Sequence, residues 1–126
     1  MAKIVQDRVL DFGLTDLHNN ADKIFIVSVD PADYTGATST YALGNKNFGA
    51  GNAVGAPAVG SPNGRKVTTT AISDGSVTAT GSATGWAIVD SANTRLLVNG
   101  GLSASQAVTT GNTFTLGAFD IRLPNQ

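Results

Sequence analysis

The chain has 126 residues, a formal net charge of −1 and no cysteine, and only 13% of its residues are charged. This length predicts a single domain that folds without disulfides or bound metal. The lack of cysteine excludes thiolate catalysis and Cys-ligated zinc, the scattered basic residues argue against a nucleic-acid partner, and no apolar run approaches the ~20 residues of a membrane span.

Residues 1–22 predict an N-terminal arm that packs on the rest of the domain. Apolar side chains recur near helical spacing with Asp and Arg between them, which predicts one short helix within Val5–Asn19. Asn19 and Asn20 are suited to end that helix. The recurring positions are Val5, Val9, Phe12 and Leu17.

Residues 23–126 predict the β domain. The segment "KIFIVSVDP" is dense in β-branched and aromatic residues, which indicates a buried strand over Lys23–Val29, ended by Asp30 and Pro31. A short extended piece is expected over Thr40–Leu43. Residues 44–64 are rich in glycine and nearly uncharged, which predicts one long loop.

Short β segments follow at regular spacing after that loop. "RKVTTTAIS" and "SVTATG" flank Asp74-Gly75, which predicts a hairpin turn. "TGWAIVD" and "TRLLVNG" flank "SAN", and "SQAVTT" and "TFTLGAFDIRL" flank Gly111-Asn112. This spacing predicts a mainly all-β fold, an antiparallel β-sandwich or jelly-roll-like barrel with one short N-terminal helix.

The hairpin "GWAIVDSANTRLLVNGG" holds the only tryptophan, Trp86. Strand alternation puts Trp86, Ile88 and Asp90 on one face and Ala87 and Val89 on the other, so we expect the strand to be covered on both sides. In the partner strand the same rule puts Leu96 and Val98 on one face and Arg95 and Leu97 on the other. Asn93 is the expected positive-φ residue of the turn. A core or subunit-interface Trp86 is favoured, and an exposed stacking platform is the alternative.

The polar residues do not form a recognisable catalytic set. His18 is the only histidine and is expected to be solvated or to cap the helix. The acidic residues are all Asp, and Asp30, Asp74 and Asp90 are expected at strand ends or turns, where Asp bonds nearby backbone N–H groups. "DPAD" is interpreted as an Asp-capped turn, because an EF-hand loop needs a closing Glu. We therefore expect no enzyme, and no catalytic, cofactor-binding or metal-binding residues.

Several stretches resemble a widespread family of small tailed-bacteriophage virion proteins, many of which are described only as hypothetical. They are "ATSTYALGNK", "GSPNGRKVTTTAISDGSVTATGSATGWAIVDSANTRLL" and "LSASQAVTTGNTFTLGAFDIRLPNQ", and "NNADKIFIVSVDPADY" is similar to that family's helix, strand and Pro turn. The shared motifs are structural, so no functional residue carries over. The resemblance implies a virion structural component, assembled in the host cytoplasm and located in the virion.

A nearly neutral surface of small residues suits a subunit covered by neighbours better than a free monomer, because charge keeps proteins apart. Together with the resemblance, this favours a capsid decoration (cement) protein whose partners are the major capsid protein, copies of itself in a homo-oligomer, or both. A tail, neck or fibre component is one alternative. A carbohydrate-binding adhesion module with a glycan on Trp86 is the other. The candidate interface residues are Val5, Val9, Phe12, Leu17, Phe48, Val54 and Val59.

Overall fold

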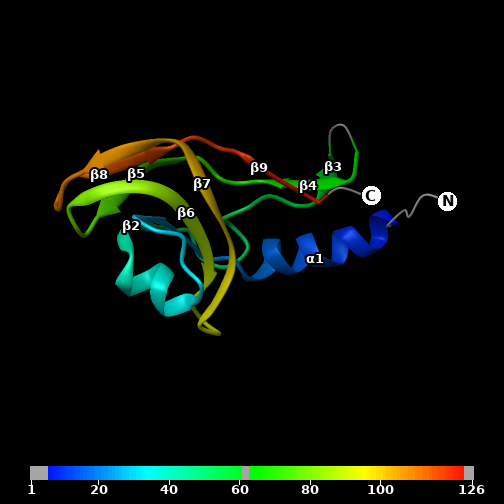
Figure 1. The fold of residues 1–126 in the computed structure, drawn as a ribbon. Coiled ribbons are helices and arrows are strands. Elements are labelled where there is room, and N and C mark those ends of the chain that lie inside the picture. Colours follow the sequence, from blue (N-terminus) through cyan, green and yellow to red (C-terminus); the bar gives the residue numbers. More distant parts are fainter. Residues whose placement is uncertain (1–5, 61–62, 124–126) are drawn as a thin grey trace.

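A computed structural model describes residues 6–60 and 63–123. These residues form two antiparallel sheets and one α-helix (Figure 1). A six-stranded sheet has the order β7-β6-β1-β2-β5-β8, and a three-stranded sheet has the order β3-β4-β9. The predicted mainly β fold with an N-terminal helix is confirmed, and the curled large sheet has the form of a half-barrel. The elements are α1 (Asp7–Asn20), β1 (Lys23–Val27), the π-helical turn η1 (Gly36–Thr40), β2 (Ala42–Asn47), β3 (Ala58–Val59), β4 (Arg65–Thr68), β5 (Ile72–Val77), β6 (Gly81–Asp90), β7 (Arg95–Val108), β8 (Thr113–Leu116) and β9 (Asp120–Leu123).

The α1 helix projects from one end of the half-barrel together with the small sheet (Figure 1). Leu10, Leu14 and Leu17 recur at helical spacing and are buried, so they form the inward stripe of α1. Polar groups hold the helix in place: Arg65 Nε of β4 donates to Asp11 Oδ1 at 2.8 Å, and His18 Nδ1 lies 2.8 Å from the carbonyl oxygen of Val54. His18 therefore joins α1 to a distant segment and does not cap the helix, which corrects the expectation from the sequence.

The β1 strand lies inside the large sheet, between β2 and β6. Ile24 and Ile26 belong to the main core cluster, whereas Phe25 and Val27 face a second cluster. This second cluster is covered by the segment around η1, where Gly36 N donates to Asp33 Oδ1 at 2.7 Å. Because both faces are covered, β1 is apolar throughout and lacks the alternation of a half-exposed strand.

Two predicted boundaries near β2 are wrong. Thr40 ends the π-helical turn, and the strand begins at Ala42. The predicted loop over residues 44–64 is too long, because β2 continues to Asn47 and Ala58–Val59 forms β3. Gly44 lies in the strand because the β5 backbone passes close by: a Cβ there would lie 2.5 Å from the carbonyl oxygen of Ser76. The glycine content of this segment therefore reflects tight packing as well as turns.

The predicted turn at Asp74-Gly75 is also wrong, because both residues lie inside β5. That strand pairs with β2 and β8, so it is not the second half of a hairpin with β4. Gly75 is directly opposite Phe114, and a Cβ on Gly75 would lie 2.3 Å from the Phe114 ring atom Cε1. Gly75 is thus required by the aromatic ring that covers it, and no reversal of the chain occurs there.

The β6–β7 hairpin is present as predicted, with two differences in detail. The positive-φ residue of its turn is Thr94, with φ of 52°, and not Asn93. The register also shifts, since Val89 pairs with Leu96 and Ile88 pairs with Val98, which leaves Leu97 as a bulge residue. Because of the bulge, Leu96 and Val98 do not share a face as predicted: Leu97 and Val98 both pack on the main core, whereas Leu96 packs on the second cluster.

The last predicted hairpin does not form. β7 and β8 flank the turn at residues 109–112, but β7 pairs with β6 and β8 pairs with β5. The turn itself is tied to β5, because Gly111 N donates to the carbonyl oxygen of Val77 at 3.1 Å and Val77 N donates to that of Asn112 at 3.0 Å. β7 and β8 are consequently the two edges of the large sheet, and the half-barrel stays open between them.

Candidate functional site

The seven candidate interface residues fall into three groups in the structure. Val9, Phe12 and Val59 are exposed, with relative exposures of 62%, 64% and 73%. Phe48 is partly buried against the main core. Leu17 and Val54 are buried in that core, so their side chains are not available at the surface to contact a partner. Val5 lies outside the described residues.

Leu17 and Val54 are buried for a physical reason that the sequence pattern does not contain. Leu17 shares the inward stripe of α1 with Leu14. Val54 forms an isolated bridge with Thr69, which draws the glycine-rich segment down onto the domain. An apolar residue within a mobile loop would be exposed, whereas this segment is folded against the core.

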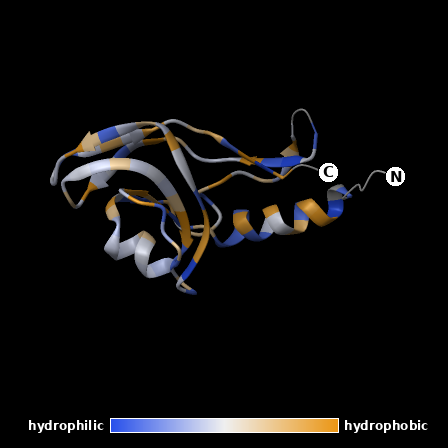
Figure 2. Ribbon diagram, in the orientation of Figure 1, coloured by the Kyte–Doolittle hydropathy of each residue, from blue (hydrophilic) through white to orange (hydrophobic). Residues whose placement is uncertain are grey.

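Val9 and Phe12 form an exposed apolar ridge on α1. They are one turn apart on the helix, and the guanidinium of Arg8 lies 5.3 Å from the centre of the Phe12 ring. Figure 2 shows hydrophobic positions along the length of α1. Because the inward stripe is already buried, this ridge adds apolar surface that the fold itself does not use.

A groove of about 240 Å³ runs beside the helix on the projecting part of the molecule. Three elements that are distant in the sequence, α1, the start of β7 and β9, supply its walls. The groove was not predicted from the sequence, because no local pattern places β9 beside α1. Its lining residues are Gly13, Leu14, Asp16, Leu17, Leu97, Val98, Ile121 and Leu123.

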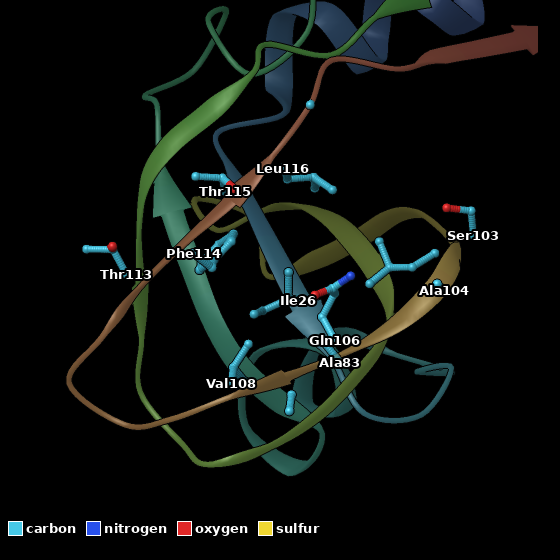
Figure 3. A pocket seen from close by; sticks show the side chains of 13 residues that line it. Ile26, Ala83, Ser103, Ala104, Gln106, Val108, Thr113, Phe114, Thr115 and Leu116 are labelled. Atoms are coloured by element: carbon cyan, nitrogen blue, oxygen red, sulfur yellow. The ribbon is translucent and has the colours of Figure 1, made fainter.

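The second surface is the gap between β7 and β8, which we call the seam. It forms a pocket of about 430 Å³ whose walls are the 102–108 part of β7 and residues 113–117, with Ile26 and Ala83 from β1 and β6 (Figure 3). None of its lining residues is charged. This pocket was not predicted either, because the sequence pattern joins its two walls into a hairpin.

Trp86 is not an open stacking platform. Its ring packs on Phe119 with centroids 4.6 Å apart and planes inclined by 45°, and it belongs to the partly buried residues around the main core. Ala87, Ile88 and Val89 are buried on the two faces of the same strand, which confirms that β6 is covered on both sides. The carbohydrate-binding alternative required an exposed Trp86, and this packing disfavours it.

The best-connected carboxylate is Asp90 at the end of β6. Its side chain is buried and accepts hydrogen bonds from Asn93 Nδ2 at 2.8 Å and from Arg95 Nη2 at 2.9 Å. These bonds hold the pKa of Asp90 below its usual range, although burial alone would raise it. Asp22 likewise accepts from the backbone N–H and the hydroxyl of Ser91. Both carboxylates fasten the β6–β7 turn, and residues 6–60 and 63–123 contain no cluster of three potential metal ligands.

Comparison of the chain with protein-family models, curated proteins and solved structures gave no match. Among the described residues, no helix has the length and apolar character needed to cross a membrane.

Proposed function

We propose that the protein is a structural subunit of a tailed-phage virion, and specifically a capsid decoration protein that contacts the major capsid protein through its projecting part. The observation that carries the proposal is the exposed ridge of Val9 and Phe12 on α1, next to a groove lined mainly by apolar residues. The assignment to a phage virion is based on the resemblance of the sequence to small virion proteins.

Three features support assembly through this part of the molecule. The helix is held rigidly by buried leucines and by the Asp11–Arg65 ion pair, so its outer face is presented in a fixed orientation. Val59 of β3 adds a further exposed apolar side chain on the projection. Exposed apolar side chains such as those of Val9 and Phe12 are typical of protein–protein contacts when they form a patch. In a lattice, many copies of a modest contact give strong total binding.

The site chemistry agrees with a structural role. Two described carboxylates have a lowered pKa. Asp90 is hydrogen-bonded by Asn93 and Arg95 within the β6–β7 turn. Asp120 of β9 is hydrogen-bonded by Thr68 and Lys66 of the neighbouring strand β4. These contacts join side chains within the β6–β7 turn and between β4 and β9, and none of the four partners lines either of the two pockets. A tail, neck or fibre component remains the alternative within the same class of protein.

Electron microscopy of particles from the phage that encodes the chain tests the location. Density for the curled sheet at regular positions on the capsid lattice is expected, with α1 facing the capsid surface. Density confined to the tail axis would exclude decoration and support the tail alternative.

Binding to particles that lack the protein tests the surface. Phe12→Asp is expected to reduce binding by about tenfold or more, because a charge would be placed in a desolvated contact. Asn19→Asp adds the same charge at another exposed position of the same helix and is expected to change binding by less than about twofold. Equal loss in both variants would indicate that the ridge is not the contact.

A further inference from the structure

The two edge strands of the large sheet border one pocket. β7 pairs only with β6, and β8 pairs only with β5, so each has a free outer edge within the described part of the chain. The two strands leave the turn at 109–112 and diverge around the pocket (Figure 3). Free edges expose rows of backbone N–H and C=O groups that are templates for pairing with another strand.

A large bulge in β7 explains why the half-barrel does not close. Ala83 pairs with Gln106 and Gly85 pairs with Gly101, so the four residues 102–105 of β7 lie opposite the single residue Thr84 of β6. Such a bulge bends its strand and increases the local twist. β7 is therefore turned away from β8 at residues 102–105, and direct pairing of the two edges is prevented.

The seam has a bulge in β7, but its lining lacks two other features with which proteins protect free edges. Charged side chains and prolines commonly blunt an exposed edge, yet the lining contains neither. Its floor is apolar, with Ile26, Ala83 and Phe114 buried in the main core. Gln106 extends over this floor toward Ile26 and is the largest polar side chain of the lining (Figure 3).

We propose that the seam is an acceptor site for an extended, uncharged segment of a partner protein, which adds as a strand between β7 and β8 and closes the half-barrel. The free edges require an occupant with backbone donors and acceptors, and the apolar floor requires that every second side chain be apolar. The uncharged lining excludes a charged segment, because its charges would be desolvated without partners.

The occupant is a different protein and not a second copy. All nine strands of the described chain already belong to one of the two sheets, so the described part of another copy could supply a strand only by unfolding one. The strand-acceptor site lies on β7 and β8, whereas the proposed capsid contact lies on α1. Failure of one proposal therefore leaves the other intact.

The probe for this site is a fluorescein-labelled peptide of alternating threonine and valine, about seven residues long, the length of an ordinary strand. We expect saturable binding measured by fluorescence anisotropy. Hydrogen exchange of the Thr115 amide, or of another amide in β7 or β8 facing the seam, is expected to slow on binding. The same peptide with alternate backbone nitrogens methylated is expected to bind at least about tenfold more weakly, because it cannot donate to a strand edge.

A pair of lysine variants locates the binding. Gln106→Lys places a charge over the seam and is expected to weaken the peptide about tenfold or more, since lysine blocks strand addition at edges. Ser82→Lys is the matched control, because Ser82 is exposed on neighbouring β6 and does not line the pocket. It is expected to leave the affinity unchanged within about twofold.

Three results would overturn the proposal. Equal binding of the methylated peptide would show that the pocket takes side chains without strand pairing. Equal affinities of the two lysine variants would place the peptide elsewhere. Self-association of the chain that Gln106→Lys abolishes would identify a second copy as the occupant, and the assignment to a different protein would then be wrong.

Discussion

Trp86 of β6 lies directly opposite Gly100 of β7, and its indole ring occupies the space where a side chain at position 100 would be. A Cβ on Gly100 would lie 2.6 Å from Cζ2 of the ring. The same arrangement recurs between Phe114 of β8 and Gly75 of β5, toward the opposite edge of the same sheet. An aromatic ring that covers a cross-strand glycine shields backbone that would otherwise be open, and it fixes the register of the pair.

We expect Gly100→Ala to lower the free energy of unfolding by about 1–3 kcal/mol, because the new methyl group would displace the indole ring from its packed position. Urea denaturation measures this change, and Trp86 fluorescence reports the displacement as a shift of the emission maximum. Gly101→Ala is the matched control, since its nearest atom would be 3.9 Å away, and it is expected to change stability by less than about 0.5 kcal/mol. In a Trp86→Val background the cost of Gly100→Ala should shrink; an unchanged cost would argue against the ring as its cause.

Gly75→Ala is expected to destabilise the protein by at least about 1–3 kcal/mol, because the Phe114 ring has no room to move without losing its place in the core. Gly117→Ala serves as the control, because a Cβ at that position would have no other atom within 4 Å. Thermal unfolding of the two variants distinguishes a packing role for Gly75 from a turn role. If Gly75 were a turn residue, Gly75→Asn would be tolerated, whereas here it should be at least as damaging as Ala.

Two α1 variants should separate the buried and the exposed apolar residues of the helix. Leu14→Ala removes a side chain that is almost fully buried and is expected to cost about 2–5 kcal/mol. Val9→Ala removes an exposed one and is expected to cost less than about 0.5 kcal/mol in the isolated protein. Chemical denaturation of both variants is the measurement. A large loss for Val9→Ala would mean that the ridge belongs to the fold and is not a contact surface.

Acid should weaken the β6–β7 turn through Asp90. Its pKa is lowered in the folded state, by hydrogen bonds from Asn93 first and from Arg95 second. The stability that Asp90 contributes is therefore fully present above its unfolded pKa of about 3.9 and is lost as the pH falls through the lower folded pKa. Asp90→Asn is expected to lower stability at pH 7 and to flatten the dependence of the unfolding free energy on pH below about 4. An identical pH dependence in the variant would contradict this account.

The relation between sequence and structure differs from one element to another. Helix α1, the strands β1 and β6 and the first half of β7 were predictable, because their signals are local: apolar residues near helical spacing, a run of β-branched residues, and alternation around a turn. The apolar positions used for the helix included Val9 and Phe12, which are exposed, whereas its buried face is formed by leucines. The turn at Asp74-Gly75 was predicted wrongly for the same reason. Asp-Gly is a common hairpin turn, but here Phe114, which is far away in the sequence, lies opposite Gly75 and requires a glycine.

The candidate surfaces were only partly predictable. Val9, Phe12 and Val59 were identified and are exposed, whereas Leu17 and Val54 were identified and are buried. An apolar residue looks the same in a sequence whether it faces the core or a partner, and the difference depends on what the rest of the chain places against it. Both pockets escaped prediction because their walls come from elements far apart in the sequence.

The sequence by itself determined that this is a mainly β protein with an N-terminal helix, because backbone conformation follows from local residue type and spacing. Only the tertiary structure decided that the large sheet stays open between β7 and β8. That outcome depends on strand order and on the bulge of four residues against one in β7. Both depend on contacts between strands that are far apart in the sequence, and no local pattern of residues encodes those contacts.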